Sequence, residues 1–227
     1  MNQAFDTDEA PIRVTETKDR ILDSAEKLFS EHGFAATSLR QITTEAAVNL
    51  AAVNYHFQTK ESLILAVLLR KLEPINQRRL ELLDEVEAEA GDDPLSLEAV
   101  LGAFLLPVLE AKDSRVQLCN FPRLMGRMYT EPGDWMLRIF PQAFAPVLAR
   151  FQPAFRRAMP GAEIEEIGWG MHFSIGAMAH YLAGGALLKT VTMGMADPSD
   201  TAAALPRLVA YMAGGLRAIT GQKEISQ

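Results

Sequence analysis

The chain has 227 residues but only one cysteine, Cys119. A single thiol excludes an intramolecular disulfide framework and any metal site built from several cysteines. It also makes a reducing cytoplasm the expected location of the protein. Hydrophobic residues make up 48% of the chain, so a sizeable apolar core, rather than disulfides or metal, is expected to stabilise the fold.

Long hydrophobic runs are missing as well. No uninterrupted apolar stretch reaches the roughly 18 residues that a membrane-spanning helix needs, so we expect no membrane partner. The first 16 residues carry acidic side chains where a secretory signal would need a basic start and an apolar run. No strand-like alternation occurs, which predicts an all-α protein.

Positive charge is scarce. The net charge of -7 argues by itself against a nucleic-acid partner, and residues 1–60 hold six basic against nine acidic side chains. Most of these acids precede Ala35, however. From Ala35 to Lys60 the only charged residues are Arg40, Glu45 and Lys60. This short region is weakly positive, so DNA binding there would depend on neutral donors, helix N-termini and dimeric avidity.

Catalytic motifs are absent too. The chain has no G-x-S-x-G, H-E-x-x-H, P-loop or paired-cysteine motif. His172 and His180 are eight residues apart, which does not match the adjacent-turn spacing of a metal site on one helix. We therefore expect no enzyme, no cofactor and no metal. A helical enzyme is the alternative, to be tested by turnover in variants that lack these two histidines.

Helical periodicity and stop signals divide the chain. We interpret residues 1–16 as a flexible arm, 17–60 as a helix-turn-helix DNA-binding domain, and 61–227 as a ligand-binding and dimerisation domain. Thr17 is the expected N-cap of the first helix and Gly33 its stop. Further helices are predicted over 38–46, 49–57, 60–90, 95–112, 114–129, 134–158, 163–189 and 201–220.

The stretch "SLRQITTEAAVNLAAVNYHFQTKESLI", residues 38–64, packs two short helices into few residues. Ser38 with Gln41 predicts a capping box, and Asn49 can cap the next helix. That helix would bury Val53 and Phe57, with Leu50 alongside. Two short helices braced by a first helix form a helix-turn-helix.

The second of these helices keeps small, polar and aromatic side chains free. Alanine can touch a thymine methyl group, asparagine can contact base edges, and tyrosine, histidine and lysine suit phosphates. Residues 37 and 38 lie at a helix N-terminus, which attracts anions. The candidate DNA-binding residues are Thr37, Ser38, Arg40, Asn49, Ala51, Ala52, Asn54, Tyr55, His56 and Lys60.

The continuous pattern "ILDSAEKLFSEHGFAATSLRQITTEAAVNLAAVNYHFQTKESL" resembles the DNA-binding domain of TetR-family transcriptional repressors. Gly33-Phe34, Thr37, the Tyr55-His56-Phe57 ending and Lys60 match the family pattern, over roughly residues 17–65. Asn54 and Asn49-Leu50 depart from its commonest form. The resemblance implies a homodimer that binds a palindromic operator in double-stranded DNA and is released by a small molecule.

Two C-terminal segments, 163–189 and 201–220, are apolar on more than one face and contain many small residues. Such helices must be buried on both sides, either in a monomer's core or between subunits. In agreement with the resemblance, we predict that they pair with their twofold mates in a four-helix dimer interface. The candidate dimerisation residues are Gly176, His180, Gly184, Leu187, Leu208, Tyr211, Met212 and Gly215.

Large soft side chains concentrate between the long fourth helix and these segments. Methionine and aromatic linings suit adaptable apolar pockets, although the same spacing also fits a plain core. Arg127 is among the polar candidates for orienting a carboxylate or phosphate. The candidate ligand-binding residues are Phe121, Leu124, Met125, Met128, Trp135, Phe140, Trp169, His172, Phe173 and Tyr181.

The sequence "VNLAAVNYHF" resembles a subset of the family that includes repressors responsive to fatty acids or their coenzyme A esters. We therefore expect an apolar effector of this kind. A repressor that senses drugs or other xenobiotics is the alternative within the same class. A helical lipid-binding protein without DNA function is the alternative outside it.

Overall fold

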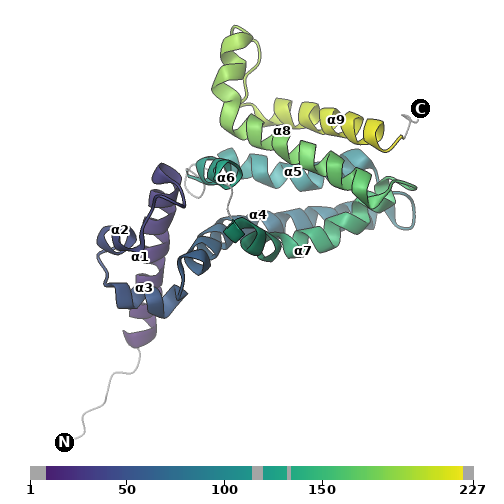
Figure 1. The fold of residues 1–227 in the computed structure, drawn as a ribbon. Helices are drawn as coiled ribbons and strands as arrows, with labels where there is room; N and C mark the ends of the chain where they lie inside the picture. Colours follow the sequence, from purple (N-terminus) through teal and green to yellow (C-terminus); the bar gives the residue numbers. More distant parts are fainter. Residues whose placement is uncertain (1–8, 114–119, 132–133, 222–227) are drawn as a thin grey trace, which may run out of the picture. The chain divides into compact units, whose positions relative to one another are not determined.

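The computed structural model describes residues 9–113, 120–131 and 134–221, and these residues form helices joined by short turns and loops (Figure 1). Within this part of the chain no strand occurs, as the sequence predicts. The helices are α1 (Glu9–His32), α2 (Leu39–Glu45), α3 (Leu50–Phe57), α4 (Lys60–Ala90), α5 (Leu97–Asp113), α6 (Phe121–Thr130), α7 (Asp134–Ala158), α8 (Ile164–Val191) and α9 (Thr201–Ile219).

The chain packs as two compact units. The first comprises residues 1–70 and 123–140, and the second comprises residues 71–122 and 141–227. Their boundaries differ from the expected ranges, because the first unit extends beyond residue 60 and also takes in most of α6 and the start of α7. The functional assignment of the ranges 17–60 and 61–227 stays a prediction.

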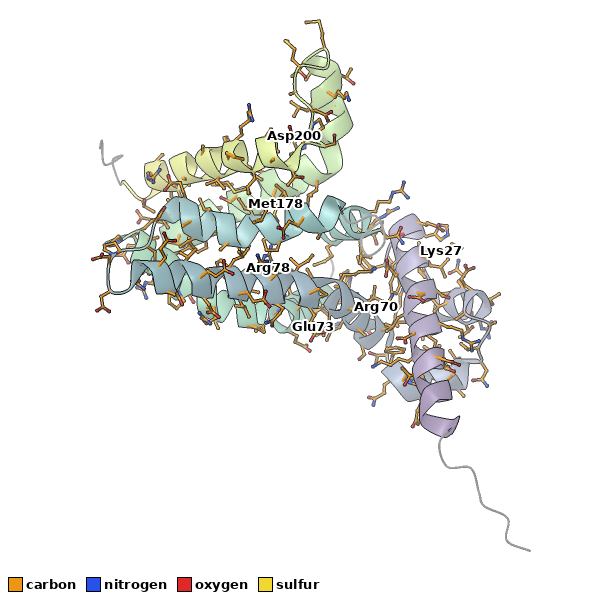
Figure 2. All side chains as sticks on the ribbon, turned by 180° about the vertical axis from the view of Figure 1, so that it is seen from behind. Lys27, Arg70, Glu73, Arg78, Met178 and Asp200 are labelled. Atoms are coloured by element: carbon orange, nitrogen blue, oxygen red, sulfur yellow. The ribbon has the colours of Figure 1, made fainter. Side chains whose placement is uncertain are left out.

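In the first unit, α1, α2 and α3 pack against one another (Figure 1) and bury apolar side chains between them. Arg70 of α4, labelled in Figure 2, forms ion pairs with Asp23 at 2.8 Å and Glu26 at 2.9 Å. These pairs tie α4 to α1. Side chains that are at most 1% exposed in the core of this unit include Ile21, Ala25, Phe29, Phe34, Ile42, Val53, Leu63, Val67, Leu68 and Leu124.

In the second unit, α9 packs against α5 and α8. A Cβ atom on Gly170 of α8 would collide with the Leu216 side chain of α9, so glycine permits this close approach. Arg79 of α4 is buried; its Nε donates to the Phe104 carbonyl of α5 at 2.8 Å, and the guanidinium lies over the Phe104 ring. The buried guanidinium of Arg79 thus joins α4 to α5 through a hydrogen bond and a ring contact, both with Phe104.

Most helix boundaries agree with the predictions, and α7 agrees at both ends. The start of α1 does not, because the helix begins at Glu9 and places Thr17 in its interior. Residues 9–16 of the expected flexible arm are therefore helical. Proline is tolerated in the first helical turn, so Pro11 does not prevent this extension. The predicted helix over 114–129 begins at Phe121 in the described residues, and 114–119 lie outside them.

Candidate nucleic-acid interface

The turn between α2 and α3 is held by the two caps that the sequence predicts. The Ser38 hydroxyl oxygen accepts from the Gln41 backbone N–H, while the Gln41 side chain accepts from the Ser38 backbone N–H at 2.7 Å. Asn49 Oδ1 accepts from the Ala52 N–H at 2.9 Å. Each cap satisfies backbone donors that a helix start leaves unpaired, so both short helices have defined beginnings.

Helix α3 separates its buried and exposed residues clearly. Val53 and Phe57 are 1% and 5% exposed, whereas Tyr55 is 77% exposed and Asn54 is also exposed. The Tyr55 ring stands edge-on to the His56 ring at 5.2 Å between centroids. We call the exposed residues Leu50, Ala51, Asn54 and Tyr55 the α3 face. Because Val53 and Phe57 anchor the opposite side in the core, this face points to solvent.

Leu50 was expected beside the buried Val53, and that expectation is wrong, because Leu50 is 44% exposed. The residue is the first of α3. Side chains on a helix lean toward its N-terminus, so the side chain of a first residue projects past the helix start instead of over the core.

Thr37 also differs from the expectation. Its side chain is fully buried, and its hydroxyl lies 2.8 Å from the Gly33 carbonyl and 3.2 Å from the Leu28 carbonyl, to which it donates. The hydroxyl therefore fastens the end of α1 and is not available for a phosphate. Ser38 is exposed, but its O–H also lies 2.8 Å from Gln41 Oε1, so a phosphate would have to displace the Gln41 amide.

The charges of this region are few and partly paired. Lys27 of α1 forms an ion pair with Glu45 at 2.6 Å, while Arg40 is exposed. Lys60 is half-buried and its Nζ donates to the Ala35 carbonyl at 3.3 Å. Burial lowers the pKa of Lys60, and the nearby acids Glu61 and Glu131 act in the opposite direction. The α3 face itself carries no charged side chain, so Arg40, Lys27 and Lys60 are the cations of this region.

The α1–α2 turn is also held by Arg127 of α6 and by Glu131, the residue after α6, a contact that the sequence did not predict. Glu131 Oε2 accepts from the Ala35 N–H at 3.2 Å, and Arg127 pairs with Glu131 at 3.2 Å. Arg127 also donates to the Glu31 carbonyl at 3.0 Å. We call the Arg127–Glu131 pair on this turn the clasp. A Cβ on Gly33, whose φ is +92°, would collide with the Glu131 carboxylate.

The predicted ligand-binding residues do not form one cluster within either unit. In the first unit, Leu124 and Met128 are buried and Trp135 contacts Phe34, with 4.9 Å between ring centroids; Phe140 is half-buried. The side chains of Phe121 and Met125 lie outside the described part of the structure. These first-unit residues belong to the packing of the unit that holds the helix-turn-helix.

The remaining ligand-binding candidates lie on α8 in the second unit. Trp169 and Phe173 are 54% and 58% exposed, with their rings stacked at 5.7 Å, and His172 is beside both. We call these three residues the α8 aromatic patch. Tyr181 is half-buried, and its hydroxyl donates to the Pro198 carbonyl at 2.8 Å.

Most predicted dimerisation residues that the structure describes are accessible in the single chain. Met212 is an exception: it is buried in the core of the second unit because α9 packs that side against the chain itself. Leu208 is half-buried, and the Gly184 position lies outside the residues whose exposure is described. The exposed members are Gly176, His180, Leu187, Tyr211 and Gly215.

The described ranges hold neither a metal-binding residue cluster nor a membrane-spanning helix. No group of three or more His, Cys, Asp or Glu side chains there is placed to hold a metal ion. None of the helices in the described ranges combines the length and apolar character that crossing a membrane requires.

Two family models match the chain. Residues 21–67 match the bacterial regulatory proteins of the tetR family, and residues 102–215 match the tetracyclin repressor-like C-terminal domain. The HTH-type transcriptional regulator AcrR of Shigella flexneri is 40% identical over 96 residues, which are 42% of this chain and 41% of that protein. The matched segments span less than half the length of the curated relatives.

Solved structures share the fold. SmeT, the repressor of the Stenotrophomonas maltophilia multidrug efflux pump SmeDEF, gives a TM-score of 0.56 at 22% identity, over 89% of this chain and 91% of that chain. A complex of SmeT with triclosan is also known. FadR, a fatty acid degradation regulator from Bacillus halodurans, gives a TM-score of 0.56 at 13% identity, over 88% of this chain and 96% of that chain. At these identities the likeness concerns the fold alone.

Proposed function

Because the chain belongs to the tetracyclin repressor-like family of bacterial regulatory proteins, we propose that it is a cytoplasmic, homodimeric, DNA-binding transcriptional repressor. Members of this family are transcription regulators rather than enzymes. Residues 17–60 bind the operator, and residues 61–227 bind the effector and the second subunit. The partners are a palindromic double-stranded operator, a second copy of the chain, and an apolar small molecule.

This proposal rests on the separation of the residues of α3 into a buried side and an exposed side. Val53 and Phe57 hold the helix in the core, while Asn54 and Tyr55 are exposed on its other side. A helix presented in this way fits the major groove, where side chains reach base edges and phosphates. In each subunit of the proposed dimer, α3 enters one of two successive major grooves.

The test is DNA binding by Tyr55→Ala, Lys60→Ala and the double variant, on the intergenic fragment beside the protein's own gene. Tyr55 is highly exposed, so its loss removes a contact without disturbing the core. We expect the double variant to lose sequence-specific retention and to keep the unfolding midpoint of the native chain. Leu148→Ala, which removes an exposed leucine on α7, is the control. Unchanged retention in the double variant would contradict the assignment of Tyr55 and Lys60 to the operator, whereas a native chain that retains no DNA would favour a lipid-binding protein without DNA function.

Dimerisation is assigned to α8 and α9. Exposed on these helices are apolar side chains such as Phe173, Leu187 and Tyr211. Contiguous exposed apolar surface marks interaction sites more often than it marks ordinary protein surface. A helix-turn-helix dimer also needs a twofold axis to place two reading helices on a palindrome. The exposed members of the predicted dimerisation set are therefore assigned to the subunit interface: Gly176, His180, Leu187, Tyr211 and Gly215.

The effector is assigned to the fatty-acid class, and a drug-like molecule is the second candidate. The resemblance of residues 48–57 favours fatty acids or acyl-coenzyme A esters, and FadR shares the fold. SmeT, of the same fold, favours the second candidate because it forms a complex with triclosan. Titration of palmitoyl-coenzyme A and of triclosan into the protein–DNA complex distinguishes the two classes. Release by palmitoyl-coenzyme A, but not by a detergent of equal chain length, supports the first.

We assign the effector's release of the protein from DNA to a change at the clasp. Residues 123–140 pack with the helix-turn-helix, while the rest of α6 and α7 belongs to the second unit. A ligand that shifts α6 therefore disturbs the Glu131 contact with the α1–α2 turn and misplaces α3. The ligand needs only to bind the misplaced state better, and a hundredfold preference corresponds to about 2.7 kcal/mol. The effector in this mechanism reorients the dimer and does not dissociate it.

A further inference from the structure

Leu50 is a large apolar side chain that α3 exposes at its first residue. It is 44% exposed, and the residues around it on the α3 face are polar or small. Single exposed leucines are common on protein surfaces and need no function. The position of Leu50 is the reason to consider one, because it stands at the start of the helix that the proposed function places in the major groove.

The neighbouring Asn49 is restricted by its cap. Its Oδ1 accepts from the Ala52 N–H at 2.9 Å. Asparagine recognises adenine through both ends of its amide, with the oxygen accepting from N6 and the nitrogen donating to N7. The cap occupies one of the two lone pairs of this oxygen and fixes the orientation of the amide. Asn49 is therefore less free than an uncapped asparagine to adopt the bidentate geometry.

The first turn of α3 otherwise offers the duplex only apolar groups. Ala51 is exposed and Ala52 is half-buried, and no charged side chain lies in this turn. In the major groove, the 5-methyl group of thymine is the apolar feature that distinguishes one base pair from the others. A leucine side chain reaches farther from the helix than an alanine does. The turn therefore suits thymine and offers little to guanine.

We infer that Leu50 is a specificity-determining residue that contacts the 5-methyl group of one thymine in each operator half-site. The inference rests on the proposed function, and it specifies thymine as the base that the first turn of α3 selects. Burial of one carbon group contributes about 0.8 kcal/mol of binding free energy. Removal of the methyl group from such a contact should therefore weaken binding about fourfold per half-site. A symmetric operator with both methyl groups removed binds about 16-fold more weakly.

The experiment begins with an operator that the full-length protein selects from a random duplex library. Each thymine of the half-site is then replaced in turn, symmetrically, by deoxyuridine, which lacks only the 5-methyl group. We expect one position to lose about 16-fold in affinity for the native chain. The same position should lose less than twofold for Leu50→Ala. Placing 5-methylcytosine there should improve binding over cytosine for the native chain alone.

Leu148→Ala is the matched control, because Leu148 is a leucine of similar exposure on α7; it should keep the full methyl dependence. Leu50→Met, which keeps an apolar side chain, should retain part of it. Native binding that is indifferent to deoxyuridine at every thymine overturns the assignment, and so does a methyl dependence that Leu50→Ala retains. Failure to select any sequence would instead contradict the proposed function, and this inference with it.

Discussion

Helices α3 and α8 both expose aromatic side chains, but in different surroundings. On α3, Tyr55 stands beside the polar Asn54 on a helix of eight residues that two buried side chains anchor. On α8, Trp169 and Phe173 stack on each other, within a helix of 28 residues that exposes further apolar side chains. A tyrosine beside polar groups suits DNA, whereas stacked aromatic rings with further apolar side chains on the same helix suit a protein partner.

The two helices also differ in the contacts that stabilise them. Helix α3 is too short to be stable alone, so it depends on its cap at Asn49 and on Val53 and Phe57. Helix α8 packs along α9, with Gly170 at a point of close approach. Substitutions on the two helices should therefore separate stability, DNA binding and dimerisation.

The largest effect is expected from Phe57→Ala. Phe57 is 5% exposed, and truncating a buried phenylalanine costs about 3–5 kcal/mol of unfolding free energy. Tyr55→Ala, two residues away on the exposed side, should change it by less than about 0.5 kcal/mol. Chemical denaturation followed by circular dichroism measures both. Equal losses in the two variants would contradict the division of α3 into a buried and an exposed side.

The next effect concerns α8. Gly176 is exposed, and a Cβ added there meets open space within the chain. Gly176→Glu should therefore fold but place a charge in the proposed interface, giving a monomer in analytical ultracentrifugation. Because dimeric avidity is worth at least about a hundredfold, operator affinity should fall by about that factor. Ala145→Glu, at an exposed alanine of α7, is the control. A Gly176→Glu chain that remains dimeric would remove α8 from the interface.

A smaller effect is expected at the clasp. Glu131→Gln keeps an oxygen that can accept from the Ala35 N–H but loses the ion pair with Arg127. We expect operator affinity to change less than about threefold. The palmitoyl-coenzyme A or triclosan concentration that releases DNA should shift by up to about fivefold, because the coupling cannot change by more than the roughly 1 kcal/mol that the ion pair contributes. Arg127→Ala should reproduce this shift. Unchanged release in both variants would exclude the clasp as the link.

The smallest effect separates the two roles of Asn49. Asn49→Ala should lower the unfolding free energy by about 1 kcal/mol, because the cap to the Ala52 N–H is lost. Asn49→Asp should keep the cap and most of the stability, while its negative charge weakens binding to phosphates. Parallel unfolding and DNA titrations distinguish the outcomes. If Asn49→Asp binds DNA as well as the native chain, Asn49 serves only as a cap.

Features that depend on local chemistry were predictable from the sequence. The caps at Ser38 and Asn49, the stop at Gly33 and the burial of Val53 and Phe57 are confirmed, since each follows from residues a few positions apart. The all-α fold followed from helical periodicity and from the absence of strand-like alternation.

Features that depend on distant residues or on orientation were not predictable. Thr37 was assigned to DNA, but its hydroxyl bonds back to the end of α1. Trp135 packs on Phe34, which is about 100 residues earlier in the chain, a contact that the sequence did not predict; its assignment to a ligand pocket stays a prediction. The contact of Glu131 with Ala35 has no local signal either. The periodicity of one segment does not show which distant residues pack against it.

The most direct test of dimeric, sequence-specific DNA binding is the selection of DNA by the native full-length chain from a random duplex library, read by sequencing. The account predicts an inverted repeat whose half-site centres lie about 10–10.5 base pairs, or a multiple of that, apart, as two α3 helices in successive major grooves require. A single unpaired half-site would contradict the dimeric geometry. No enriched sequence at all would contradict the assignment of α3 as a DNA-reading helix.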